Sequence, residues 1–212
     1  INYSQPIYVR LVEESSNYGL REIFQFNGSS YSAVQEKIDL GTENCEFLVK
    51  VKFGSFVNFA RVFDTYVNNS SNIALWFNNG LIQSRVRDAG GALNYVNVII
   101  ASYLNTNNVF EISLKLVGTR QTLSVSLNGE LIGTSTEDNA TTQPRESLLI
   151  DAGDFVIGAA AQSFGNKLPN GSQIADLKIK KNNQLLHFFD GTVIQTQRFG
   201  NAFKDKFGGA HA

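Results

Sequence analysis

The chain has 212 residues and a formal net charge of −1, and it contains 42% hydrophobic and 17% charged residues. This length and hydrophobic content suffice for one sizeable core, while the missing basic excess argues against a nucleic-acid partner or an anionic-membrane anchor. The single cysteine, Cys45, excludes an internal disulfide and a cysteine-rich zinc site. No apolar run approaches the roughly 20 residues of a membrane-spanning helix, so we expect no membrane insertion.

Short runs of two-residue hydrophobic alternation follow one another along the chain and predict β-strands. In chain order the strands are expected at residues 7–12, 23–26, 45–53, 60–63, 73–77, 81–87, 95–103, 110–116, 122–127, 131–135, 148–150, 155–157, 174–179 and 185–189. Residues 64–72 are expected to form a polar loop, and residues 158–172 a small-residue loop. Asn128-Gly129 tolerates positive φ angles and predicts a tight hairpin, and Asn78-Asn79-Gly80 predicts a second one.

Many short strands joined by local turns indicate an all-β fold, a two-sheet antiparallel jelly-roll sandwich. The pattern centres on a three-stranded meander over residues 110–135. Neither an internal repeat nor a composition shift is visible, so residues 1–212 are expected to form a single domain. The start at Ile1 and the absence of methionine lead us to expect a piece excised from a longer protein.

Several fragments resemble the concanavalin A-like lectin/glucanase superfamily, and within it the laminin-G-like branch. The matching fragments are residues 26–31 (FNGSSY), 47–53 (FLVKVKF), 127–132 (LNGELI), 155–158 (FVIG) and 174–179 (IADLKI). The resemblance implies a concanavalin A-like sandwich that binds carbohydrate or protein, or that carries a glycan-cleaving enzyme. Because a fold does not decide function, the residues must decide between these classes.

The residues argue against catalysis. Glycosidases of this superfamily place carboxylates at alternate positions of one strand, and neither Glu13-Glu14 nor the segment 36–39 has that spacing. Lyases on this scaffold need clustered Arg, His and Tyr, whereas His187 lies in a strand and His211 in a tail. We therefore expect no enzymatic activity, with a divergent glycan-cleaving enzyme kept as the remote alternative.

A carbohydrate site needs an aromatic ring face together with amide or guanidinium groups that hydrogen-bond sugar hydroxyls. If Ile73, Leu75 and Phe77 face the core, then Trp76 and Asn78 point outward; the alternative is that both sides of this strand are buried. The outward reading predicts that Trp76→Ala weakens glycan binding and barely changes the melting transition.

Further candidates for this site lie on the two strands that follow and on a loop. They are Arg85 and Arg87 on one strand, Tyr95, Asn97 and Tyr103 on the next, and Asn166 in the loop 162–166. The alternative for each is a solvated sheet face with cation–π pairs.

A metal site is suggested by residues 63–68 (FDTYVN), which are similar to the F-D-T-Y-x-N segment with which legume lectins hold calcium and a transition metal. This similarity implies Asp64 as a Ca²⁺ ligand. The lectin glutamate two positions before the aspartate is Val62 here, and the aspartate after the asparagine has no counterpart.

The C-terminal run 199–209 (FGNAFKDKFGG) resembles endings found beside such domains in bacteriophage tail proteins. We therefore expect a non-catalytic module that binds a cell-surface polysaccharide or oligosaccharide. It is expected to serve host attachment as part of a larger, multi-copy protein, outside the cell or on a virion surface. The alternative is a structural or protein-interaction module of a larger assembly.

Overall fold

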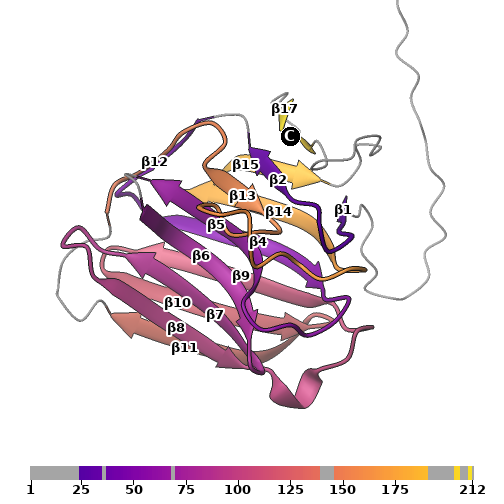
Figure 1. Ribbon diagram of the computed structural model, residues 1–212. Coiled ribbons are helices and arrows are strands. Elements are labelled where there is room, and N and C mark those ends of the chain that lie inside the picture. Colours follow the sequence, from indigo (N-terminus) through magenta and orange to yellow (C-terminus); the bar gives the residue numbers. More distant parts are fainter. Residues whose placement is uncertain are drawn as a thin grey trace, which may run out of the picture.

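Strands make up nearly all the regular structure of the described chain (Figure 1). The computed structural model describes residues 24–34, 37–67, 70–138, 146–190, 203–205 and 210–211. The strands are β1 (Phe24–Gln25), β2 (Ser32–Val34), β3 (Ile38–Gly41), β4 (Cys45–Lys52), β5 (Ala60–Val67), β6 (Ser70–Asn78), β7 (Leu81–Arg87), β8 (Leu93–Ile99), β9 (Phe110–Val117), β10 (Arg120–Leu127), β11 (Glu130–Asp138), β12 (Leu148–Ile150), β13 (Phe155–Ile157), β14 (Gln173–Lys181), β15 (Gln184–Asp190), β16 (Phe203–Asp205) and β17 (Ala210–His211). Within these ranges no helix is long and apolar enough to cross a membrane. The strand expected at residues 7–12 and most of the run 199–209 lie outside the described residues.

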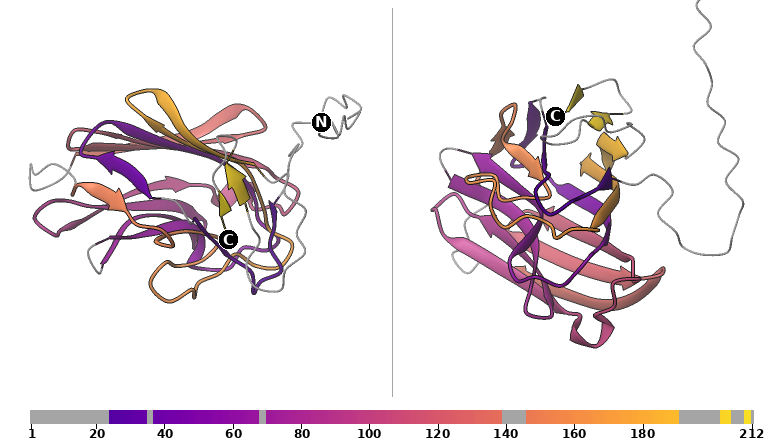
Figure 2. Two further views of the ribbon diagram at one scale, coloured as in Figure 1. Left: turned by 90° about the horizontal axis from the view of Figure 1, so that it is seen from above. Right: turned by 45° about the vertical axis from the view of Figure 1, so that its right-hand side comes forward.

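The strands form two facing layers, which Figure 2 shows one above the other when the molecule is seen from above. One layer has the order β11-β10-β9-β4-β14 and the other the order β2-β13-β5-β6-β7-β8, and the path β15-β16-β17 links them. Neighbouring strands are antiparallel in both layers, and β12 and β3 form a separate pair. The predicted all-β sandwich is thereby confirmed, whereas a single domain over residues 1–212 stays a prediction.

Phenylalanines from both layers fill the space between the sheets. The ring of Phe47 on β4 lies 5.2 Å from Phe63 on β5 and 6.3 Å from Phe155 on β13. Phe53, just after β4, packs 5.7 Å from Phe77 on β6. These rings are almost completely buried, and aromatic side chains of this size contribute strongly to a core.

The two Asn-Gly hairpins form where the sequence predicts them. Asn79 and Gly80 have φ angles of 47° and 78°, and Asn128 and Gly129 have φ angles of 51° and 84°. These left-handed pairs match the twist of antiparallel strands, so β6 returns directly as β7 and β10 as β11. The expected meander is confirmed as β9, β10 and β11.

The expected polar loop at residues 64–72 is wrong, because β5 continues to Val67 and β6 begins at Ser70. Two bulges in the pairing of β5 with β6 break the two-residue alternation. Thr65 satisfies the backbone at one of them: its hydroxyl accepts a hydrogen bond from Ile73 N at 2.9 Å and donates one to Ile73 O at 3.2 Å. Polar residues therefore occupy buried strand positions here.

Candidate functional site

Strands β5 to β8 turn one side towards the core and the other side outward. Ile73, Leu75 and Phe77 belong to the core, so the alternate residues of β6, including Ala74 and Trp76, lie on the opposite side. The cross-strand rows on that side are Arg61–Trp76–Gln83–Asn97 and Asp64–Ala74–Arg85–Tyr95. We call this outward surface the β5–β8 face and define it by these eight residues.

Trp76 lies on the β5–β8 face but is covered by its neighbours. The Arg61 guanidinium carbon sits 4.3 Å from the centre of the indole ring, and that of Arg85 lies at 5.9 Å. Tyr95 packs edge-on against the ring at 6.2 Å, and only 5% of Trp76 is exposed. Trp76 lies on the side opposite the core, but Ala74 and Trp76 are buried too, so both sides of this strand are buried, as the alternative hypothesis predicts. The small effect of Trp76→Ala on stability is therefore no longer expected.

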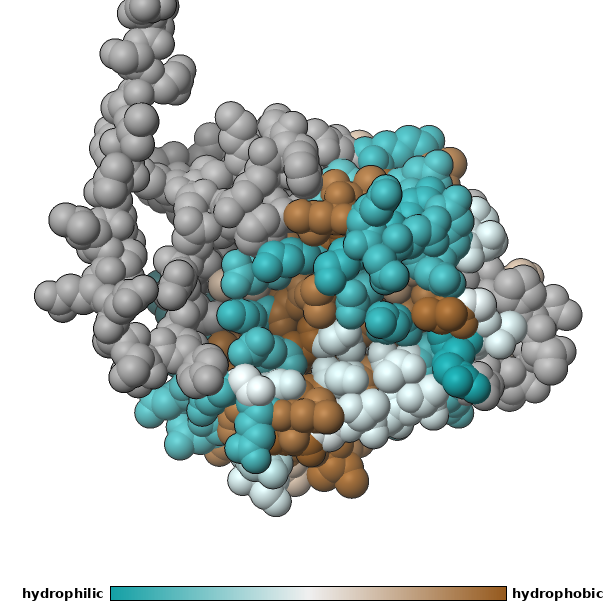
Figure 3. Space-filling view, turned by 180° about the vertical axis from the view of Figure 1, so that it is seen from behind, coloured by the Kyte–Doolittle hydropathy of each residue, from teal (hydrophilic) through white to brown (hydrophobic). Residues whose placement is uncertain are grey.

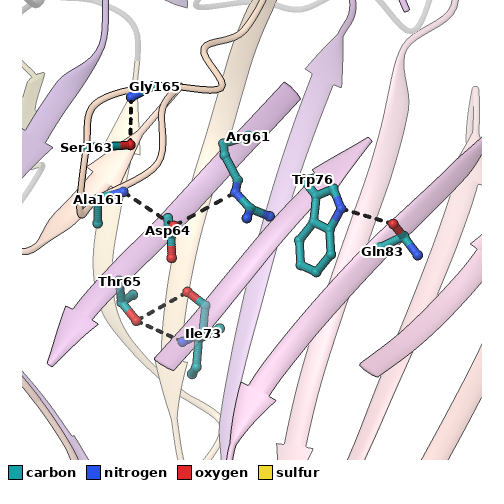
Figure 4. Close-up of polar contacts among 9 residues, drawn as sticks. All are labelled: Arg61, Asp64, Thr65, Ile73, Trp76, Gln83, Ala161, Ser163 and Gly165. Carbon is teal, nitrogen blue, oxygen red and sulfur yellow. Dashed lines mark hydrogen bonds and ion pairs between the residues drawn. The ribbon is translucent and has the colours of Figure 1, made fainter. Parts of the chain in front are cut away.

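Two hydrogen bonds in series run from the indole across the face, and Figure 4 shows the first of them, from Trp76 to Gln83. Trp76 Nε1 donates to Gln83 Oε1 at 3.0 Å, and Gln83 Nε2 donates to Asn97 Oδ1 at 2.8 Å. These two bonds hold each amide in one orientation. Asn97, the last residue of this hydrogen-bonded row, is exposed.

Arg61 and Asp64 form a buried pair beside Trp76, drawn in Figure 4. Arg61 Nε lies 3.8 Å from Asp64 Oδ2, and the two side chains are only 11% and 3% exposed. Burial lowers the pKa of Arg61, Asp64 opposes that change, and the nearby positive charge of Arg85 adds to it. The Nε and Nη1 atoms of Arg61 are buried, and in the described part of the chain neither of them donates a hydrogen bond. The guanidinium is therefore desolvated and incompletely paired.

The loop after β13 borders this pair. Ala161 N donates to Asp64 Oδ2 at 3.3 Å, and Arg61 N donates to Asn166 O at 2.9 Å, so both arms of the loop attach to β5. At its tip, exposed Phe164 stacks on Tyr31 with ring centres 4.5 Å apart. Asn166, which the sequence analysis predicts as a site residue, thus lies next to Arg61, and its backbone carbonyl makes the contact.

Three predicted residues lie at the margins of this arrangement. Asn78 is half-buried at the end of β6, and Arg87 donates from Nη1 to Gly91 O at 2.7 Å, which fastens the β7–β8 loop. Tyr103 was expected on one strand with Tyr95, but β8 ends at Ile99 and Tyr103 belongs to a short 3-10 helix. Its backbone N donates to Ile100 O at 2.8 Å, which closes that turn. The structure thus brings together Trp76, Arg85, Tyr95 and Asn97.

Sequence reasoning missed Arg61 and Gln83. Gln83 alternates with Arg85 on β7, so the strand pattern could have included it. Arg61 lies in the strand expected at residues 60–63, and only the pairing of β5 with β6 reveals that it lies beside Trp76.

The implied calcium ligand Asp64 is engaged with Arg61 and Ala161 N, and its lectin-like companion Asn68 lies outside the described residues. Among the residues that the structure describes, no group of three His, Cys, Asp or Glu side chains could hold a metal ion. A cation at Asp64 would meet the positive charge of Arg61. The calcium site stays a prediction.

Asp64→Asn is expected to lower the free energy of unfolding by about 1–3 kcal/mol, because it removes the anion that faces a buried guanidinium. The measurement is urea unfolding followed by circular dichroism, with excess EDTA and with excess CaCl₂. Asp176→Asn is the matched control, since Asp176 pairs with Lys50 at 3.7 Å but is one-third exposed; its loss is expected to cost less than about 1 kcal/mol. Equal losses, or a calcium-dependent stability that Asp64→Asn abolishes, would contradict this assignment.

The other layer, β11-β10-β9-β4-β14, presents a different surface. Figure 3 shows the molecule from that side. On β10 and β11 short hydroxyl side chains bond one another, as Thr122 does with Thr136 and Thr134 with Ser124, both at 3.1 Å. Near-neutral and hydrophobic colours are interspersed with hydrophilic ones there. Because β10 and β11 carry no aromatic side chain that could stack on a sugar ring, this surface is a weaker candidate than the β5–β8 face.

A cavity of about 280 Å³ opens elsewhere, at the ends of β4 and β9. Its lining includes Glu46, whose carboxylate already accepts hydrogen bonds from Ser113 Oγ at 3.0 Å and Lys180 Nζ at 3.2 Å. No aromatic side chain is among its lining residues, so the cavity lacks the ring face that a carbohydrate site needs.

Comparison with known proteins bears on the fold. No family model and no curated protein sequence matches the chain. Among solved structures, domains LG4-5 of the mouse laminin alpha1 chain match with a TM-score of 0.62 and 13% identity, covering 84% of this chain and 46% of that one. The receptor-binding domain of botulinum neurotoxin D matches with a TM-score of 0.52 and 15% identity, covering 84% and 44%. The chain thus spans less than half the length of either structure.

These likenesses confirm the fold expected from the sequence motifs. The chain has a concanavalin A-like jelly-roll sandwich, the fold of laminin G domains.

Proposed function

We propose that this chain is a non-catalytic carbohydrate-binding module, and that it recognises a cell-surface polysaccharide through the β5–β8 face. The observation that carries the proposal is the row of aromatic, amide and guanidinium groups around Trp76. Ring faces cover the C–H surface of a sugar, and amide and guanidinium groups bind its hydroxyls.

The face supports binding because its groups are already held in position. Tyr95 is 42% exposed and rests on the Trp76 ring, so its own ring is available to a ligand. Gln83 and Asn97 are fixed by the hydrogen bonds that start at the indole. A site that is ordered before binding loses less conformational entropy when the ligand arrives.

A binding role is also favoured by how the buried carboxylates of this region are used. Asp64 accepts from Ala161 N, and Asp88 accepts from Ala92 N at 2.8 Å, so both hold neighbouring loops. Glycoside hydrolysis needs two carboxyl groups that face one substrate. We therefore assign the face to recognition and not to cleavage.

We extend the proposal to host attachment by a bacteriophage tail protein, on the resemblance of the run 199–209 to such proteins. The module would then act on the virion surface as one of several copies. Several weak sites on one particle bind together far more tightly than each binds alone.

A glycan array, probed with and without chelator, tests the proposal. Binding to a defined set of glycans is expected, and it should persist in EDTA because Asp64 faces Arg61. The alternative is a protein-interaction module, which the strongly exposed Ile99 on β8 and Leu131 on β11 favour. A silent array together with tight self-association would select that alternative.

Tyr95→Ala is expected to weaken glycan binding by about 1–2 kcal/mol, five- to thirtyfold, because the exposed ring is the stacking surface. Isothermal titration with a glycan from the array measures the change. Tyr103→Ala is the matched control, since Tyr103 is 37% exposed but lies on the 3-10 helix. If both variants bind like the parent protein, the β5–β8 face is not the site.

A further inference from the structure

We propose that two copies of this chain pair antiparallel along the free edge of β8, so that the β5–β8 faces of both copies form one continuous glycan-binding surface. Tyr95 of the partner subunit then lies opposite Asn97 and contributes to the site. The shared site rests on the proposed function, whereas the pairing itself is tested without a glycan. Three features support the proposal: the composition of β8, the direction of its backbone groups, and its place beside the site.

The sandwich has two edge strands on one side. β8 is the last strand of one layer and β11 the last strand of the other, and the two lie against each other (Figure 1). The unpaired backbone of an edge strand is a template for a further strand, and proteins usually protect it with charges or bulges. β11 has both protections, because Glu130 and Glu137 are exposed and a bulge shifts its pairing with β10 between Val125 and Ser126.

β8 has neither protection. Residues 93–99 read LNYVNVI, with no charged residue and no proline, and they pair with β7 without a bulge. Among the described residues, no strand pairs with the other side of β8. Tyr, Val and Ile favour strands, and Ile99 is 71% exposed at the end of this one. A regular, uncharged edge of this kind is suited to bind another strand.

The direction of the backbone groups decides which residues of β8 can bind a partner. Ile100 N donates to Gly80 O at 2.8 Å, so the even-numbered positions of β8 turn their backbone groups towards β7. Successive residues of an antiparallel ladder turn these groups to opposite sides. The residues that direct N–H and C=O to the free edge are therefore Leu93, Tyr95, Asn97 and Ile99.

Two copies use all four of these residues in one register, which is centred on Val96. Leu93 then lies opposite Ile99 of the partner subunit, and Tyr95 lies opposite Asn97 of the partner subunit. The first pair covers the exposed Ile99 with an apolar side chain, and such cross-strand pairs stabilise a sheet. Because β8 carries no charge, no like charges meet. The strand is thus complementary to a second copy of itself.

The pairing extends the candidate site. Opposite residues of an antiparallel pair project from the same side of the sheet, so the β5–β8 face of one copy continues into that of the other. The row that ends in Asn97 continues with Tyr95 and Arg85 of the partner subunit. An exposed amide and an exposed ring thereby meet across the two copies. A sugar needs both kinds of group, and two joined sites hold a long polysaccharide more tightly than one.

Sedimentation velocity of the full chain over a range of concentrations tests the pairing. The parent protein is expected to form a dimer that dissociates on dilution. Ile99→Pro is expected to be monomeric, because proline removes an N–H that points to the partner and leaves the ladder with β7 intact. Ile99→Thr is the matched control, since it keeps this N–H and a β-branched side chain, and it is expected to dimerise. A monomeric parent protein, or a dimeric Ile99→Pro variant, would overturn the proposal.

Cysteine substitutions test the register, and they decide the matter if circular dichroism shows that Ile99→Pro is unfolded. A Leu93→Cys/Ile99→Cys double variant is expected to form disulfide-linked dimers under mild oxidation, because opposite Cα atoms lie about 5.5 Å apart. Each single variant is expected to stay unlinked, since its new cysteine lies opposite an isoleucine or a leucine. The native Cys45 is buried and does not compete. An unlinked double variant, or linked single variants, would contradict the register.

Glycan binding separates the shared site from the proposed function. The strongest glycan of the array is titrated as a free oligosaccharide at concentrations where the parent protein is dimeric. Ile99→Pro is expected to bind it about three- to tenfold more weakly than Ile99→Thr, because a monomer lacks the ring of the partner subunit. Equal binding by the two variants would overturn the shared site and leave a carbohydrate-binding module. A silent array beside a dimer linked through β8 would overturn the proposed function and keep the pairing.

Discussion

Trp76→Ala is expected to lower the free energy of unfolding by about 3–5 kcal/mol, the usual cost of removing a large buried aromatic side chain. The indole is 95% covered, and its loss also removes the surface on which Arg61 rests at 4.3 Å. The Arg61 guanidinium would then lose a cation–π contact in a place where solvent compensates little. Urea unfolding followed by circular dichroism measures the change, because the variant has no tryptophan left to report it.

Trp76→Phe is the control that keeps an aromatic ring under Arg61. It is expected to retain most of the stability while losing the hydrogen bond to Gln83 Oε1. A Trp76→Ala variant with unchanged unfolding and abolished glycan binding would contradict the structure and restore Trp76 as the exposed stacking ring expected from the sequence.

Gly158→Ala has the second large expected effect, a loss of about 2–5 kcal/mol in the free energy of unfolding. Gly158 has a φ of 83°, and a Cβ atom there would overlap the buried Phe26 ring. A left-handed backbone costs an L-residue about 1–2 kcal/mol, and overfilling a packed core costs about 1–3 kcal/mol more. Urea unfolding measures the sum.

Gly153→Ala separates the two contributions, because Gly153 has a φ of 89° and nothing within 4 Å of the added Cβ. It is expected to show the backbone cost alone. Gly158 also anchors the loop beside the site: its N donates to Val62 O at 2.9 Å, and its O accepts from Leu168 N at 2.8 Å. Gly158→Ala is therefore expected to weaken glycan binding, and equal effects of the two variants would show that the Phe26 ring can move aside.

The sequence predicts most of the fold because its turns are local. Asn79-Gly80 sets a two-residue hairpin, and counting back from that turn pairs Trp76 with Gln83. Arg85 alternates with Gln83 on β7 and so lies on the same face, whereas its pairing with Tyr95 depends on the loop that joins β7 to β8. The Trp76–Gln83 pair and the place of Arg85 could thus be predicted from one hairpin and the two-residue alternation of strands.

The rest of the site depends on contacts between distant segments. The neighbourhood of Arg61 and Trp76 follows from pairing of β5 with β6 across two bulges, which shift the register by amounts that no local signal gives. The backbone bond from Arg61 N to Asn166 O joins segments about a hundred residues apart. Polar residues at 64 and 65 indicated a loop because their buried partners, Arg61 and Ile73, are visible only in three dimensions.

The bond from the indole to Gln83 has a consequence for ligand choice. If Trp76 carried no N–H, the glutamine amide could rotate by half a turn and offer its oxygen to Asn97, whose amide would turn in response. The surface would then display acceptors where it now displays donors, although no residue in contact with the ligand had been replaced. Whether the β5–β8 face offers donors or acceptors would thus be set by the indole nitrogen of Trp76, a residue that is itself almost completely buried.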